Sequence, residues 1–421
     1  MKKKFEIYTL DALEVLGKTV ILRVDINQPI DKATDTLADD TRIKGCIPTI
    51  RELKERGAKV VVLAHQGSDI EYENFYTLRP HAKVISKLLG EPVKFIPDVC
   101  GPAAQQAIGA LAAGEVLLLD NVRFMSEEQT LFENSLKLTH EQQAQTMVVK
   151  TLAPLADYYV CDAFAAAHRS QPTLCGFQQV LPSAMGRLFE KEYSIISSLM
   201  EAPERPSVFV LGGAKIADAF LMLRTVLERG AADKILTGGL AGHVLLAAKG
   251  ISIGRASLNF IEKKGFKGFI QDAKQLLAQY GNKIQLPLDL AYVSEAERKE
   301  SDIHHLDDGQ MYMDIGAKTV ARYEAIILEA STIFVNGPMG VFEKEVTEYG
   351  TKGVWNALAH SKGYTVIGGG DSVTATNRYG LQNQMGYICT GGGALIRFLT
   401  GEELPVIKAL RYAADKYPLE G

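Results

Sequence analysis

Strongly apolar runs alternate with segments of helical spacing along this chain of 421 residues. The runs at 19–27 (TVILRVDIN) and 59–67 (KVVVLAHQG) start with apolar side chains on both faces and end on polar ones, and residues 41–56 between them have helical spacing. Strands that are apolar on both faces belong to parallel sheets whose two sides are covered by helices. The sequence therefore predicts an α/β protein built on doubly wound parallel sheets.

One interruption divides this alternation into two halves. Residues 201–206, EAPERP, contain two prolines and no apolar side chain larger than alanine, which indicates a domain boundary. A chain of this length is also long for a single hydrophobic core. We predict an N-terminal domain of residues 1–184, a connecting helix and linker of residues 185–203, and a C-terminal domain of residues 204–399.

Composition restricts the functional classes. The formal net charge of −4 argues against a protein that coats nucleic acid. The five cysteines lack C-x-x-C spacing, which is typical of reduced thiols in the cytosol. No apolar run approaches the roughly 18 residues that span a bilayer, and the first residues lack the features of a signal peptide. We therefore expect a cytoplasmic protein with neither a membrane nor a nucleic-acid partner.

The stretch 366–372, VIGGGDS, carries the clearest local signal of function. Three glycines between an apolar run and an acid predict a strand, a tight turn and a helix start, where backbone N–H groups can bind an anion. Asp371 would offer a carboxylate to a phosphate-bound magnesium ion, and Ser372 would cap the helix or donate to a phosphate. A purely structural turn is the alternative, but other strands of this half also end on glycine. These strand ends lie at residues 207–213, 234–239, 332–338 and 387–393.

The strand ends of the first half carry charged and polar side chains instead of glycines. Several arginines that converge on one sheet edge would bind a small, multiply charged anion, although each arginine alone could be a surface ion pair. The two halves therefore indicate an anion site and a nucleotide site. The residues concerned in the first half are Arg23, Asp25, Asn27, His65 and Arg123 at the strand ends, His168 and Arg169 after a short turn, and Arg42 at the start of the first helix.

Three familiar nucleotide-binding signatures are missing. The G-K-T sequence that ends at Thr19 has Ala12 where a Walker A loop needs its first glycine. No G-x-G-x-x-G opens a helix after a strand, as a dinucleotide site would require. The H-R-D and D-F-G signatures of protein kinases are also missing. The nucleotide site must therefore be of another kind.

Seven segments match one known family, in that family's order along the chain. They are RVDIN (23–27), NVRF (121–124), DAFAAAHR (162–169), LGGAKIAD (211–218), NGPMGVFE (336–343), GGGDS (368–372) and CTGGGA (389–394). The chain is thus similar to the phosphoglycerate kinases, and HRSQPTLCGF and LTGGLAG resemble their archaeal branch. The resemblance implies two doubly wound, Rossmann-like domains that face each other across a hinged cleft, with residues 400–421 packing back on the first domain.

The resemblance also implies roles for individual residues. Lys215 would accompany the transferred phosphoryl group, Glu343 would contact the ribose hydroxyls, and Asp371 would hold the metal. Catalytic roles would fall on Arg42, Lys215, Gly370 and Gly393. The 3-phosphoglycerate site would comprise Asp25, Asn27, Arg42, His65, Arg123 and Arg169. The nucleotide site would comprise Gly213, Lys215, Gly238, Gly239, Asn336, Pro338, Glu343, Gly369, Gly370, Asp371 and Ser372.

The activity implied by the resemblance is reversible phosphoryl transfer between 1,3-bisphosphoglycerate with ADP and 3-phosphoglycerate with ATP, with Mg²⁺ and domain closure. The attacking carboxylate is ionised at neutral pH, so no general base is needed. Two alternatives stay open: a kinase for another phosphorylated carboxylate, and a catalytically silent nucleotide-binding paralogue. We expect a monomer, and a dimer is left open.

Two positions depart from the family pattern. Ser68 and Asp69 stand where the family commonly has a basic residue shortly after the histidine of the second strand. We therefore predict a weaker hold on the 3-phosphate, unless Arg79 or Lys83 reaches the site. Ala219 replaces a second lysine found in many members outside the archaea. Neutralisation of the phosphates would then depend more heavily on the lysine of LGGAKIAD.

Overall fold

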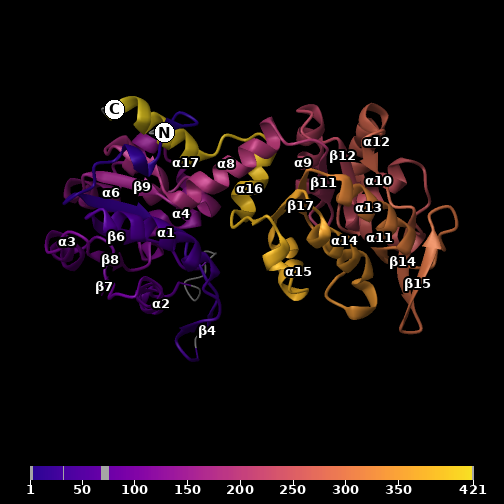
Figure 1. Cartoon of the computed structure of the whole chain (residues 1–421), viewed down its shortest axis with the longest axis horizontal. Helices are drawn as coiled ribbons and strands as arrows, with labels where there is room; N and C mark the ends of the chain where they lie inside the picture. Colours follow the sequence, from indigo (N-terminus) through magenta and orange to yellow (C-terminus); the bar gives the residue numbers. More distant parts are fainter. Residues whose placement is uncertain (1–2, 32, 68–74, 420–421) are drawn as a thin grey trace. The chain divides into compact units, whose positions relative to one another are not determined.

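The computed structural model describes residues 3–31, 33–67 and 75–419. Ser68 and Asp69 lie outside the described residues. Within the described ranges, no helix is both long and apolar enough to cross a membrane. The chain divides into two compact units, each with its own six-stranded sheet (Figure 1). Unit 1 comprises Met1–Ser194 and Glu403–Gly421, and unit 2 comprises Ile195–Glu402.

The sheet of unit 1 contains six parallel strands in the order β10-β9-β3-β6-β8-β7. Its central strands are apolar and almost wholly buried, as a sheet covered by helices on both faces requires. The sheet strands are β3 (Thr19–Arg23), β6 (Lys59–Leu63), β7 (Lys94–Ile96), β8 (Val116–Leu119), β9 (Tyr158–Cys161) and β10 (Ser183–Met185). Two short antiparallel pairs are β1 (Lys3–Lys4) with β2 (Ile7–Tyr8), and β4 (Ile30–Asp31) with β5 (Thr36–Leu37). The helices are α1 (Thr41–Glu55), α2 (Arg79–Leu89), α3 (Pro102–Gly109), α4 (Thr130–Leu136), α5 (His140–Gln143), α6 (Met147–Leu152), α7 (Pro172–Cys175), α17 (Pro405–Lys416) and α8 (Arg187–Glu201), which continues into unit 2.

Unit 2 repeats this plan with six parallel strands in the order β13-β12-β11-β17-β18-β19. The predicted α/β class with doubly wound parallel sheets is therefore confirmed for both units. The sheet strands are β11 (Ser207–Leu211), β12 (Lys234–Thr237), β13 (Ile284–Gln285), β17 (Thr332–Asn336), β18 (Tyr364–Gly368) and β19 (Tyr387–Ile388). The helices are α9 (Ile216–Glu228), α10 (Gly239–Ala248), α11 (Arg255–Lys263), α12 (Phe269–Tyr280), α13 (Ala317–Glu329), α14 (Tyr349–His360), α15 (Gly370–Arg378) and α16 (Gly392–Leu399).

Unit 2 also contains a small antiparallel sheet that the sequence did not predict. The charged residues 294–308 favour a solvated insertion, yet they contain β15 (Glu297–Asp302), which pairs along its whole length with β14 (Asp289–Ser294). Strand β16 (Tyr312–Ile315) pairs with the other edge of β14. Charged side chains are tolerated in β15 because an antiparallel pair can face water on one side.

In each sheet, the chain continues from two neighbouring middle strands toward opposite edges of the sheet. In unit 2, β11 leads to β12 and β13 on one side, and β17 leads to β18 and β19 on the other. In unit 1, β3 leads to β6 and β9 leads to β10, again on opposite sides. In open parallel sheets, ligands bind beyond the carboxyl ends of the strands at this reversal of direction. The ends of β3 and β9, and of β11 and β17, are therefore the expected ligand sites.

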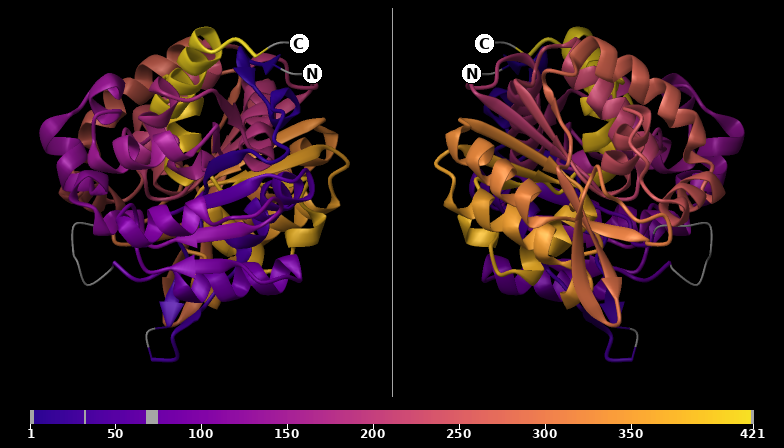
Figure 2. Two further views of the ribbon diagram at one scale, coloured as in Figure 1. Left: turned by 90° about the vertical axis from the view of Figure 1, so that its left-hand side faces the viewer. Right: turned by 90° about the vertical axis from the view of Figure 1, so that its right-hand side faces the viewer.

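Both ends of the chain belong to unit 1. Figures 1 and 2 show the two termini side by side, with α17 next to the N-terminal strands. The Lys3 ammonium donates to the Ala414 carbonyl at 3.2 Å, and the Leu419 N–H donates to the Tyr8 hydroxyl at 2.8 Å. The first and last segments of the chain therefore complete the same unit.

Asp162 follows β9 and has a fully buried carboxyl group. One oxygen accepts a hydrogen bond from the Phe189 N–H at 3.0 Å, and the other has no hydrogen-bond partner among the described residues. Burial raises the pKa of Asp162 from 3.8 to about 7, although its hydrogen bonds act in the opposite direction. The folded state thus holds a proton here that the unfolded chain releases at lower pH.

This pKa difference predicts a pH-dependent stability. Because the folded-state pKa of Asp162 is raised, its stabilising effect is present at low pH and is lost as the pH rises from about 4 to about 7. Between pH 5 and pH 8, we expect the loss to be on the order of 2–3 kcal/mol in unit 1. Hydrogen exchange in β9 during urea unfolding should show this loss of stability. Asp162→Asn should remove the part of the pH dependence that comes from Asp162. A variant with the full wild-type pH dependence would contradict the assignment.

Candidate functional site

Arg23 ends β3 and is fully buried in unit 1. Its Nε donates to Thr173 Oγ1 at 3.0 Å, and a terminal nitrogen lies 3.1 Å from His65 Nδ1. Because arginine has only donors, Nδ1 accepts and the neutral imidazole carries its proton on Nε2. Burial lowers the pKa of His65 well below 6.5. The charges of Arg23 and Arg123 lower this pKa further, whereas the charge of Asp25 acts in the opposite direction. His65 is therefore an uncharged hydrogen-bond donor at neutral pH.

Asp25 connects two of the predicted site residues. Its Oδ2 lies 2.7 Å from a terminal nitrogen of Arg42, and its Oδ1 accepts the Asn27 N–H at 3.1 Å. Burial alone would raise the pKa of Asp25, but the charge of Arg42 and the Asn27 hydrogen bond contribute to holding it at about 2. The ion pair therefore persists across the neutral range and orients Arg42, whose side chain is 36% exposed.

Arg123 and Arg169 add two further cations to this group. Arg123 is buried and donates to the Gly67 carbonyl, while its Nε has no hydrogen-bond partner among the described residues. Burial, followed by the like charges of Arg169 and Arg23, lowers the pKa of Arg123 to about 10. Arg169 lies 3.5 Å from Glu133. An anionic ligand would relieve the repulsion between these guanidinium groups and satisfy the unpaired Nε.

Two residues behind Arg23 were missed by the sequence analysis. Glu128 is fully buried and accepts hydrogen bonds from the Thr173 N–H at 2.6 Å and the Thr173 hydroxyl at 2.8 Å. The same hydroxyl oxygen accepts from Arg23 Nε. Burial raises the pKa of Glu128 to about 7. Glu128 and Thr173 thus hold Arg23 in place, and no sequence pattern distinguishes them from surface residues.

Arg79 and Lys83 were the cations expected to compensate for Ser68. Both are exposed on α2, and the guanidinium carbon of Arg79 lies 4.8 Å from the centroid of the Phe95 ring. Arg79 is thus engaged in a cation–π contact with strand β7. Because Ser68 lies outside the described residues, compensation at that position stays a prediction.

The loops after β11, β12 and β17 of unit 2 are joined by backbone hydrogen bonds. The Gly213 N–H donates to the Pro338 carbonyl at 2.7 Å, and the Gly239 N–H donates to the Met339 carbonyl at 2.7 Å. A Cβ atom on Gly239 would lie 2.7 Å from backbone atoms of Gly213. These glycines therefore allow the loops to approach each other closely, while their amides are used within the protein.

The N-terminus of α15 is the part of VIGGGDS that keeps open amides. The first-turn N–H groups of Gly370, Asp371 and Ser372 have no acceptor inside the helix. Gly369, with φ 81°, precedes the helix, and Ser372 does not cap it. Instead the buried Ser372 hydroxyl accepts the Gly337 N–H at 2.7 Å. Ser372 therefore links this helix to the loop after β17.

Two hollows of unit 2 share Gly213, Ala214 and Asp371 in their walls. The larger has a volume of about 300 Å³ and a mainly apolar lining that suits a planar ring. The smaller has a volume of about 30 Å³, and its lining of Lys215 and glycine backbone offers positive charge and N–H groups to a phosphate oxygen. The larger hollow is also lined by Gly239, Leu240, His243, Phe260, Met311, Tyr312, Met313, Pro338, Gly340, Val341, Phe342 and Glu343. The smaller hollow is also lined by Gly212, Lys215, Asn336, Gly337, Gly369, Gly370, Ser372 and Ile396.

Two predicted residues lie at other helix starts of unit 2. Gly238 immediately precedes α10, and Gly393 is in the first turn of α16. The remaining predicted nucleotide residues line the two hollows. The six residues predicted to bind 3-phosphoglycerate all lie in unit 1.

Asp371 is the carboxylate that could hold a metal. Within the described part of the chain, no group of three or more His, Cys, Asp or Glu side chains could bind one. Asp371 is exposed, lines both hollows and lies at the start of α15. Mg²⁺ commonly takes one or two carboxylates and completes its shell with water and substrate phosphates. The donor set therefore fits a metal that arrives with a nucleotide.

The hollows at the reversal point of one sheet, together with the arginine cluster at the end of another, define an α/β protein with features suited to a nucleotide in one unit and to a small anion in the other. The sequence profile described as phosphoglycerate kinase matches residues 10–402. The chain belongs to the phosphoglycerate kinase family.

Relatives of this family match along nearly the whole chain. The phosphoglycerate kinase of Methanothermobacter thermautotrophicus is 43% identical over 96% of this chain and 97% of its own length. That of Methanococcus maripaludis is 44% identical over 98% and 99%, respectively. The crystal structure of phosphoglycerate kinase from Pyrococcus horikoshii OT3 superimposes with a TM-score of 0.85 at 40% identity, covering 98% of this chain and all of that one. The resemblance predicted from the seven segments is confirmed.

Proposed function

We propose that this protein catalyses reversible phosphoryl transfer between 1,3-bisphosphoglycerate with ADP and 3-phosphoglycerate with ATP. The observation that carries the proposal is the smaller hollow of unit 2, lined by Lys215, Asp371 and the start of α15. A lysine charge and open helix N–H groups suit a transferring phosphoryl group, because its transition state spreads negative charge over three oxygens. The names of the relatives support the same reaction.

The arginine cluster of unit 1 supports an acceptor with a phosphate and a carboxylate. Arg123 and Arg169 would bind the phosphate, and Arg42 would approach the reacting carboxylate. The Nε2–H of His65 would donate a hydrogen bond without adding charge. Because a carboxylate is already ionised at neutral pH, none of these residues needs to remove a proton. The site would act by positioning and by charge neutralisation.

Direct transfer requires the acceptor bound to unit 1 to meet the nucleotide bound to unit 2 during turnover. We therefore propose a closing motion that excludes water from the reacting groups. Small-angle X-ray scattering should show a smaller radius of gyration with 3-phosphoglycerate and ATP together than with either ligand alone. An unchanged radius with both ligands would contradict the closing motion.

When bound, Mg²⁺ would offset the charge of the nucleotide phosphates, and we propose that Asp371 holds it directly or through water. Asp371→Asn keeps the size of the side chain but removes its charge. We expect the Mg²⁺ concentration for half-maximal activity to rise about tenfold. Asp415→Asn, an exposed change on α17, is the matched control and should leave this value unchanged. Equal values in both variants would argue against Asp371 as the metal residue.

A coupled assay with 3-phosphoglycerate, ATP and Mg²⁺ tests the proposed activity itself. Turnover at rates typical of kinases, roughly 1–100 per second, would support it. Nucleotide binding without turnover would indicate the silent paralogue, and turnover with a different phosphorylated carboxylate alone would indicate the other kinase.

We further propose that the enzyme works as a monomer in the cytoplasm. Light scattering during size-exclusion chromatography tests whether it is a monomer.

A further inference from the structure

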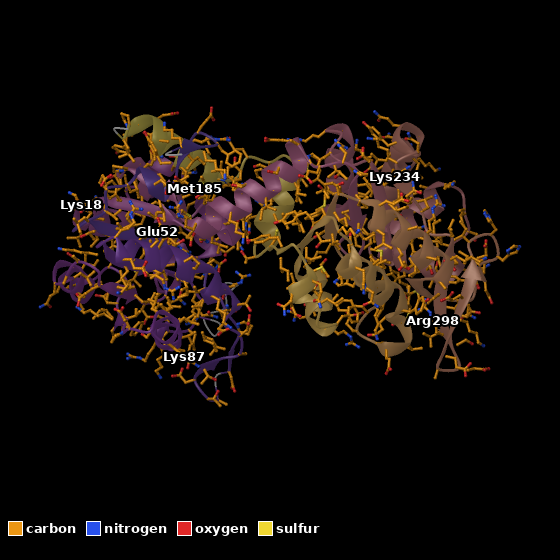
Figure 3. All side chains as sticks on the ribbon, viewed as in Figure 1. Lys18, Glu52, Lys87, Met185, Lys234 and Arg298 are labelled. Carbon is orange, nitrogen blue, oxygen red and sulfur yellow. The ribbon has the colours of Figure 1, made fainter. Side chains whose placement is uncertain are left out.

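A third cavity of unit 2 runs along the edge strand β13 and has a volume of about 720 Å³. This edge cavity shares no lining residue with the two hollows described above. Its volume falls within the range that accommodates small organic ligands. Lys234, labelled in Figure 3, starts β12 and lines one wall. The cavity is also lined by Ala248, Lys249, Lys274, Leu277, Ala278, Gly281, Asn282, Ile284, Gln285, Leu286, Pro287, Leu288, Ile303 and Arg322.

The charged residues of the edge cavity all have the same sign. Four cations line it, while none of its lining residues is Asp or Glu. Acidic residues outnumber basic ones 50 to 46 in the whole sequence, so this local excess departs from the chain average. Among the described residues, none of the four cations takes part in an ion pair; they are Lys234, Lys249, Lys274 and Arg322.

Hydrogen bonds fix two of these cations in the cavity wall. Arg322 donates to the side-chain oxygen of Gln285 at 2.5 Å, and Gln285 is only 7% exposed. The main-chain oxygen of Gln285 accepts from Thr237 at 2.9 Å, which holds β13 in place. Lys234 donates to the Asn282 carbonyl at 3.0 Å. The guanidinium and one ammonium group thus each have one hydrogen bond to the cavity wall.

Neutralisation of helix dipoles does not explain the whole set of cations. Lys249 follows the last residue of α10, where a cation is stabilised by the carbonyl end of a helix. Lys274 lies in the middle of α12 and Arg322 in the middle of α13, where the dipole has little effect. Lys234 starts a strand. The helix dipole thus accounts for one of the four cations, and what distinguishes the set is that all four line one cavity without an acidic residue.

We propose that the edge cavity binds a phosphorylated small molecule with a flat apolar part. The cations would bind its phosphate, and the apolar side chains of Ile284, Pro287 and Ile303 would contact its ring. The site is separate from the nucleotide hollows but linked to them through α10, which starts at Gly239 in the larger hollow and ends at Ala248 in the edge cavity. The proposal does not depend on the proposed activity.

Pyridoxal 5′-phosphate is a probe with this chemistry, because it combines an aromatic ring, a phosphate and an aldehyde. A lysine amine attacks the aldehyde carbon with loss of water, and borohydride then delivers hydride to the imine carbon, leaving a stable secondary amine. Peptide mass spectrometry of the full chain identifies each labelled lysine. At limiting probe, we expect labelling of Lys234, Lys249 and Lys274 to exceed that of the exposed Lys344 and Lys362 about tenfold.

Two controls separate binding from intrinsic lysine reactivity. Pyridoxal without the phosphate should show no such preference, since a lysine made reactive only by its neighbours would label equally with both probes. Arg322→Gln removes a phosphate partner but no labelled lysine, and should reduce labelling in the cavity about fivefold. Arg255→Gln, an exposed change elsewhere in unit 2, should have no effect.

The outcomes are distinct. A preference that requires the phosphate and falls in Arg322→Gln supports the site. Labelling that follows exposure alone, or that is equal with both aldehydes, or that is the same in both arginine variants, overturns it. Labelling of Lys215 is read separately in the same experiment and reports only on the nucleotide hollow. A failure of the edge cavity and a failure of the proposed function are thus distinguishable.

Discussion

Arg42→Met is expected to lower kcat by on the order of a thousandfold, while the affinity of unit 2 for nucleotide stays unchanged. Arg42 is a partly exposed member of the arginine cluster, and its guanidinium is oriented by Asp25 at 2.7 Å. Methionine keeps the length of the side chain but removes both the charge and the planar donors. Because the proposed reaction has no general base, charge neutralisation at the transferring group carries most of the catalysis, and its loss should affect kcat more than KM.

Arg51→Met is the matched control for this variant. Arg51 lies on the same helix, α1, is exposed, and donates to the Leu88 carbonyl at 3.1 Å. Its replacement should leave kcat within about twofold of the wild type, since it removes the same charge at a distance from Asp25. Steady-state kinetics in both directions and calorimetric titration of ADP separate the effects. A fall in kcat of less than tenfold for Arg42→Met would exclude a catalytic role for this arginine.

Gly337→Ala is expected to disrupt the nucleotide site of unit 2 through the backbone. Gly337 has φ 94°, and an added Cβ would lie 2.4 Å from the Gly212 carbonyl oxygen. The left-handed conformation alone costs an L-residue about 1–2 kcal/mol, and the contact with a backbone atom forces the two loops apart. We expect unit 2 to lose on the order of 2–4 kcal/mol of stability and ADP affinity to fall at least about tenfold.

Gly268→Ala provides the comparison within the same unit. Gly268 has a negative φ, and an added Cβ would meet nothing within 4 Å. This change should leave ADP affinity unchanged and stability within about 0.5 kcal/mol of the wild type. Unfolding of unit 2 followed by hydrogen exchange, together with ADP titration, gives both quantities. If Gly337→Ala behaved like Gly268→Ala, the close approach of the loops would have no role in nucleotide binding.

The two parallel sheets were predictable because their central strands are buried on both faces. A run such as KVVVL in β6 leaves a continuous apolar signal that no surface element shares. Strand β15, ERKESD, leaves no such signal, because it pairs in an antiparallel sheet and carries charges along its length. The pairing that holds it comes from β14, and a tertiary partner is not visible in a local pattern.

Some residues of the candidate site could be predicted from local sequence patterns, and others could not. Strand-end residues such as Asp25 and His65 could be named from the sequence, because the carboxyl ends of parallel strands converge. Their roles stay predictions. The buried acid Glu128 could not be named, since a glutamate is usually a surface residue and only its contacts with Thr173 reveal its function. The sequence also did not show that the amides of Gly213 and Gly239 are already used by carbonyl groups.

The placement of both chain ends in unit 1 has a consequence for synthesis on the ribosome. Unit 2 is one continuous stretch, whereas residues 403–421 of unit 1 are translated only after it. Until then unit 1 lacks α17, whose Val406, Ile407 and Leu410 are buried in the finished protein. The domain that is started first is therefore finished last, and its nascent form exposes an apolar surface throughout the translation of unit 2. Chaperones that shield such surfaces would act on unit 1 during this interval.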